Sequence, residues 1–107
     1  MANGSNHKIQ RNQKYSIDIT AYEYDVLGKN HLISMACKLY LQSAIKHDDE
    51  VALILTLTEL QDLIGYVAAE ANHARSKRNS EDLNIICDYL EAAEEDIKHG
   101  RIDSFDT

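Results

Sequence analysis

Residues 57–78 read LTELQDLIGYVAAEANHARSKR, and they carry the most informative helical pattern in the chain. Apolar residues recur there at intervals of three and four, which places them along one side of a helix. These residues are Leu60, Leu63, Ile64, Val67, Ala71 and Ala74. We therefore expect a helix over about residues 59–77 that packs at the centre of its domain.

Another side of this predicted helix consists of small residues, namely Gly65, Ala68 and Ala69. A glycine inside a helix costs about 1 kcal/mol relative to alanine. Close packing against a neighbouring helix would offset that cost. The pattern therefore predicts a close helix–helix interface at these three positions.

The residues before this stretch predict one strand and one long helix. Residues 15–19 alternate apolar and polar side chains, which is typical of a half-buried strand. Thr20 and Glu23 have the spacing of a capping box, so a helix is expected to begin near Ala21. We expect that helix to run to about His47, with a bend near Gly28.

Residues 51–57, VALILTL, fit either a strand or the buried start of a helix. We favour an extended segment, with Thr58 and Gln61 forming a capping box for the helix that follows. A last helix is expected from an N-cap at Asn79 or Ser80 to about His99, with Gly100 as the residue after its C-cap.

The expected fold class is mainly α, a small three-helix bundle with one or two short edge strands. A chain of 107 residues corresponds to one domain, and the absence of proline permits long helices. We expect a disordered, polar and basic N-terminal tail over residues 1–14. A single helical domain is expected over residues 15–100, followed by a loosely held tail over residues 101–107.

Charge is distributed unevenly along this chain of net charge −7. Residues 1–14 carry three basic groups and no acid, whereas most of the negative charge lies after residue 79. No domain-wide basic surface is expected, which argues against nucleic acid as a partner. No apolar run is long enough to span a membrane, so we expect a cytoplasmic protein without a membrane partner.

Carboxylates at helical spacing suggest an alternative, metal-dependent function. One edge of the predicted central helix is polar and consists of Glu59, Asp62, Tyr66, Glu70 and His73. We consider this edge, together with Glu94 of the last helix, as a ligand or metal site. All-α nucleotide pyrophosphatases hold Mg²⁺ or Mn²⁺ with such helix-borne acids. The EExxE cluster of those enzymes is missing here, and eighteen acids make spacings such as Glu70-x-x-His73 common by chance.

No pattern of nucleophilic catalysis is present. The chain has no G-x-S-x-G sequence, its glycines do not cluster, and Cys37 and Cys87 lie on apolar stripes. We therefore expect a protein-interaction module without a cofactor that forms a homo-oligomer, in the simplest case a symmetric dimer. The alternatives are the Mg²⁺ or Mn²⁺ hydrolase and an acidic regulator of a nucleic-acid-binding protein.

Overall fold

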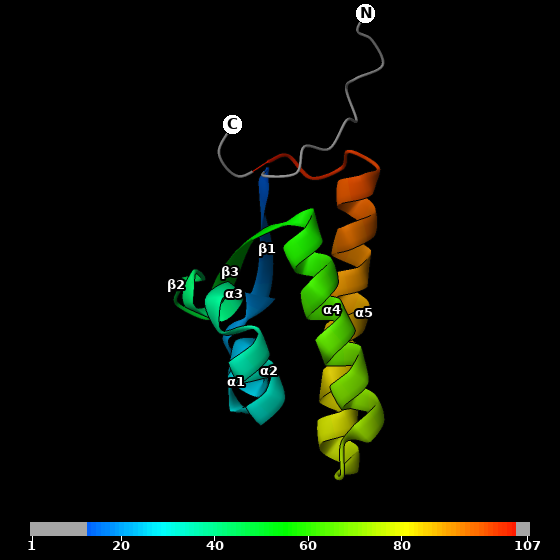
Figure 1. Cartoon of the computed structure of the whole chain (residues 1–107). Coiled ribbons are helices and arrows are strands. Elements are labelled where there is room, and N and C mark those ends of the chain that lie inside the picture. Colours follow the sequence, from blue (N-terminus) through cyan, green and yellow to red (C-terminus); the bar gives the residue numbers. More distant parts are fainter. Residues whose placement is uncertain (1–12, 105–107) are drawn as a thin grey trace, which may run out of the picture.

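The computed structural model describes residues 13–104, which form one α+β domain (Figure 1). Its elements follow one another as β1 (Lys14–Thr20), α1 (Ala21–Lys29), α2 (His31–Ala36), α3 (Lys38–Gln42), β2 (Ile45–His47), β3 (Glu50–Thr56), α4 (Leu57–His73) and α5 (Lys77–Lys98). The expected N-terminal tail lies mostly outside the described residues.

The prediction of a three-helix bundle is wrong, because the chain forms a three-stranded antiparallel sheet of order β1-β3-β2. The ambiguous run VALILTL supplies its central strand, β3. Alternate residues of β3 meet apolar residues of β1, as in the pairs Ile17↔Leu53 and Ile19↔Val51. The strand assignment follows from this pairing, since a run of apolar residues alone does not distinguish a strand from a buried helix.

The predicted long helix over residues 21–47 is also wrong. The helix is interrupted at Asn30. Its Oδ1 accepts a hydrogen bond from the Ile33 backbone N–H at 2.9 Å and so caps α2. Cys37 separates α2 from α3, and residues 45–47 leave the helix to form β2. The break therefore lies two residues after Gly28, where we expected a bend.

Two capping boxes begin the helices that follow β1 and β3. The predicted box of Thr20 and Glu23 is confirmed at the start of α1. The box predicted at Thr58 and Gln61 is wrong, because Thr56 and Glu59 cap α4 instead. Thr56 is the last residue of β3, so the helix begins directly where the sheet ends.

A helical hairpin of α4 and α5 forms the other half of the domain. The N-cap of α5 is Ser76, earlier than the predicted Asn79 or Ser80. Ser80 instead donates a hydrogen bond to the Ala71 carbonyl at 3.0 Å and ties the two helices together. Gly100 follows the C-cap as predicted, at φ 72°, a conformation that favours glycine.

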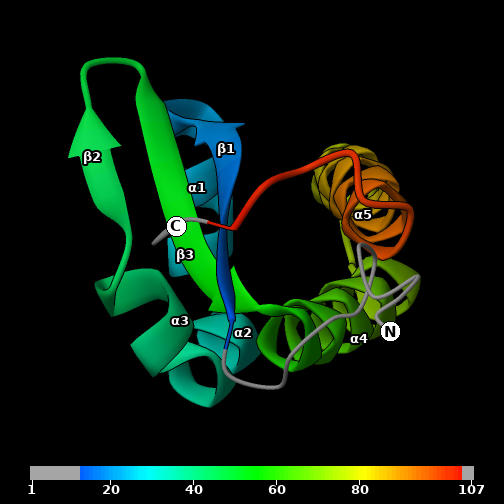
Figure 2. The ribbon, with the colours of Figure 1, turned by 90° about the horizontal axis from the view of Figure 1, so that it is seen from above.

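The sheet and the helices enclose one hydrophobic core. Figure 2 shows the α4–α5 hairpin beside the sheet and the shorter helices. The predicted stripe of α4 is buried from Leu60 to Ala71. Ile102 packs against the core, and Ser104 forms a β-bridge with Tyr15, so residues 101–104 are held against the body. No helix of the described range is long and apolar enough to cross a membrane.

Candidate functional site

Helices α2 and α3 lie antiparallel to α4 and are joined to it by a side-chain hydrogen bond at each end. Asn30 Nδ2 donates to Glu70 Oε1 at 3.0 Å, and the Tyr40 hydroxyl donates to Asp62 Oδ2 at 2.8 Å. Figures 1 and 2 both place these three helices on one side of the molecule. We call this surface the α2–α4 face, composed of the exposed residues of α2, α3 and α4.

An apolar stripe lies exposed on α2 and α3. Leu32, Met35 and Leu39 have exposed fractions of 43 %, 65 % and 74 %. Their spacing puts them along one side of the two short helices. Contiguous exposed apolar residues of this kind mark interaction surfaces more often than isolated ones do.

A shallow hollow of about 280 Å³ lies on the exposed side of α4. Its lining residues are Gln61, Asp62, Gly65, Tyr66 and Ala69. A Cβ atom placed on Gly65 would meet no other atom within 4 Å. Gly65 therefore makes no close helix contact within the described chain, while Ala68 packs on the core. The interface predicted at Gly65, Ala68 and Ala69 stays a prediction.

The exposed residues of α4 carry little charge. Of Thr58, Gln61, Asp62, Gly65, Ala69, Asn72 and His73, only Asp62 is a carboxylate. By contrast, the exposed residues of α5 include four acids and three bases; these are Glu81, Asp88, Glu91, Glu95, Lys77, Arg78 and Lys98. Depletion of charge is typical of the centre of a protein–protein interface.

The predicted polar edge of α4 is occupied by structural hydrogen bonds. Glu59 caps its own helix, and Glu70 accepts a hydrogen bond from Asn30. His73 Nδ1 instead contacts the Ala69 carbonyl at 2.8 Å. Glu94 accepts a hydrogen bond from Gln61 at 2.8 Å and pairs with Lys98 at 3.2 Å.

The acids that the sequence suggested as metal ligands do not gather into one site. Among residues 13–104, no group of three or more His, Cys, Asp and Glu side chains could hold a metal ion. The suggested spacings therefore do not produce a shared donor set for Mg²⁺ or Mn²⁺ in that part of the chain.

Two nearby groups keep their protons more strongly than usual. The hydrogen bond to Asp62, together with burial, raises the pKa of the Tyr40 phenol to about 12. Burial, and then the charge of Asp62, raises the pKa of the Cys37 thiol to about 11. A thiol with a raised pKa is a poor nucleophile, and Cys37 is also fully buried.

The exposed apolar stripe of Leu32, Met35 and Leu39 was not predicted from the sequence. Their i, i+3 and i+7 spacing is visible in the sequence, but Leu27, Ile33, Cys37 and Leu41 form a competing stripe that enters the core. Leu27 and Leu41 are buried in the core. The exposed stripe could be separated from the core stripe only once the helices were placed.

Comparisons of the chain with models of protein families, with curated proteins and with solved structures found no match.

Proposed function

We propose that the protein is a cytoplasmic protein-interaction module that associates with a second copy of itself through the α2–α4 face. The observation that carries the proposal is the exposed apolar stripe of Leu32, Met35 and Leu39 beside the nearly uncharged side of α4. Burying such a stripe against a partner would contribute roughly 25 cal/mol for each Å² of apolar surface removed from water.

The charge of the chain favours this face for self-association. Two copies with a net charge of −7 repel each other over most of their surfaces. The α2–α4 face carries few acids, and it offers Lys38 on α3 and Asp62 on α4. In a two-fold symmetric dimer each surface meets its own copy, so one basic and one acidic group can pair across the interface twice.

Sedimentation of matched variants tests the proposal. We expect the parent chain to form dimers that dissociate on dilution, and Met35→Glu or Leu39→Glu to be monomeric, because a buried unpaired charge is costly. Ile85→Glu is the control, since Ile85 on α5 is 60 % exposed and lies outside the face. A parent chain that stays monomeric at high concentration would exclude self-association, and loss of the dimer in all three variants would exclude this face.

A further inference from the structure

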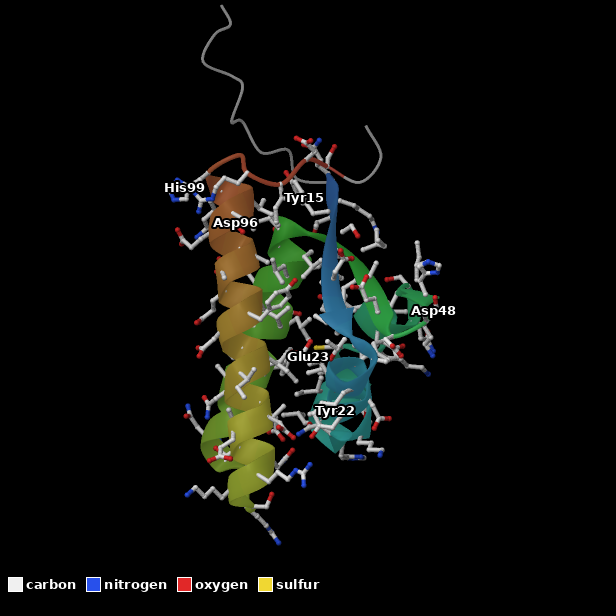
Figure 3. All side chains as sticks on the ribbon, turned by 180° about the vertical axis from the view of Figure 1, so that it is seen from behind. Tyr15, Tyr22, Glu23, Asp48, Asp96 and His99 are labelled. Carbon is white, nitrogen blue, oxygen red and sulfur yellow. The ribbon has the colours of Figure 1, made fainter. Side chains whose placement is uncertain are left out.

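A groove lies on another side of the molecule, between α5 and the β1–α1 corner. It consists of two adjoining hollows of about 300 Å³ and 280 Å³ that share Asp18 and Tyr89. In Figure 3 Glu23 belongs to the β1–α1 side and Asp96 to α5, and the two elements stand next to each other. We call this feature the β1–α5 groove, and it is separate from the α2–α4 face.

The groove combines an apolar floor with acidic walls. Ile17, Ile19 and Ala93 contribute to its lining, and Tyr89 stands at its centre with 44 % of its surface exposed. The walls carry four carboxylates, and among residues 13–104 the lining includes no lysine, arginine or histidine; the four are Asp18, Glu23, Glu50 and Asp96.

Two of these four carboxylates have no partner within the part of the chain that the structure describes. Asp96 pairs with Arg101 at 2.7 Å, and Glu23 is used in the capping box. Asp18 and Glu50 have no hydrogen-bond or ion-pair partner among residues 13–104. Asp18 lies on β1 and Glu50 on the neighbouring strand β3. Burial raises the pKa of the Tyr89 phenol, and the charges of the surrounding carboxylates, Asp18 and Glu50 among them, raise it further.

The charges are spread along the groove rather than gathered at one point. No set of three acids in the described range is close enough to hold a metal ion. An extended occupant with several separate positive charges matches this spacing, whereas a single cation does not. An exposed tyrosine ring also attracts lysine and arginine side chains through its π face.

We infer that the β1–α5 groove binds an extended segment of a partner protein rich in lysine and arginine, with one cationic side chain over Tyr89 and others beside Asp18 and Glu50. Charge complementarity identifies the partner, because the described residues that line the groove include four acids and no base. The inference is independent of self-association, since it uses neither α2 nor α4.

Fluorescence anisotropy with a labelled octa-arginine peptide tests the inference. The Asp18→Asn/Glu50→Gln variant is expected to weaken binding about tenfold, or 1.4 kcal/mol. Glu81→Gln/Glu91→Gln removes the same charge from exposed positions of α5 outside the groove and should change binding less than about twofold. Equal losses in the two double variants would mean that only net charge matters, and would overturn the inference.

Two further variants separate the remaining outcomes. Tyr89→Ala should weaken binding severalfold while Tyr89→Phe, which keeps the ring, should not; equal binding by all three would remove Tyr89 from the site. Lys8→Glu/Arg11→Glu should leave peptide affinity unchanged. Tighter binding by that variant would assign the groove to the chain's own basic N-terminal segment and overturn the proposal of a separate partner.

Discussion

The side-chain amide of Asn30 joins two helices whose bonded residues lie forty positions apart. Its Nδ2 donates to Glu70 Oε1 at 3.0 Å, while its Oδ1 accepts from the Ile33 N–H at 2.9 Å. The same side chain therefore ends the first helical segment, caps α2 and fixes α2 against α4. The α2–α4 face depends on this placement.

Replacing Glu70 tests that bond. Glu70→Ala should lower the free energy of unfolding by about 1 kcal/mol, because the half-buried Asn30 amide loses its acceptor. Glu70→Gln keeps an oxygen acceptor and should cost less. His73→Ala should change stability by less than about 0.5 kcal/mol, since His73 is exposed and bonds only its own helix. Urea denaturation measures all three, and a larger loss for His73→Ala than for Glu70→Ala would contradict this account.

The bond between Tyr40 and Asp62 predicts a loss of stability at alkaline pH. The folded state raises the pKa of Tyr40 from 10.0 to about 12, mainly because the protonated phenol donates to Asp62. Below pH 10 the phenol is protonated in both states, and its stabilising contribution is complete. Between pH 10 and 12 the unfolded chain loses the proton first, so the contribution falls as pH rises.

Tyr40→Phe removes the titrating group and serves as the comparison. The variant should be less stable than the parent at neutral pH, and the difference should shrink as the pH rises from 10 to 12. Unfolding followed by circular dichroism at several pH values measures this difference. A constant difference across that range would show that the bond does not raise the pKa of Tyr40.

Substitutions at the start of α4 test which of two threonines caps the helix. Thr56→Ala should cost about 1 kcal/mol because it removes the side chain that accepts the Glu59 N–H at 3.1 Å. Thr58→Ala should cost less than about 0.5 kcal/mol, because Thr58 is exposed on the first turn. Thermal unfolding of the two variants distinguishes the observed cap from the one that the sequence suggested.

Local patterns predicted the elements whose signals are complete within a few residues. The alternation of residues 15–19, the capping box of Thr20 and Glu23, and the stripe of α4 all correspond to the structure. The C-terminal end of α5 at Gly100 was equally clear, because the residue after a C-cap commonly adopts a positive φ, which favours glycine.

Long-range pairing decided the rest of the fold. Nothing within VALILTL separates a strand from a helix, and the choice depends on β1, which lies more than thirty residues earlier and pairs with it. Asn30 sits inside a helical pattern, but its competing side-chain bonds to Ile33 and Glu70 end α1 there. The exposed stripe of α2 and α3 could not be predicted for the same reason, since its exposure depends on where these two short helices pack.

A single substitution at Gly65 tests both the stability of the monomer and its self-association. Gly65→Ala should raise the free energy of unfolding of the monomer by up to about 1 kcal/mol, because a Cβ there meets nothing within 4 Å and alanine favours the helix. If a second copy approaches α4 at the hollow, the same methyl group should weaken the dimer. Gly28→Ala is the matched control, since Gly28 is also helical with open space around it and lies on α1.

The expected result is that both glycine variants are more stable than the parent, while only Gly65→Ala dissociates at higher concentration in sedimentation. A larger residue extends the test, and Gly65→Leu should weaken the dimer further without unfolding the monomer, since a Cβ at this exposed position meets nothing within 4 Å. Equal association of the parent and Gly65→Ala would place the contact elsewhere on the α2–α4 face. In that case the glycine would have no role in packing, and its cost of about 1 kcal/mol to α4 would lack a compensating contact.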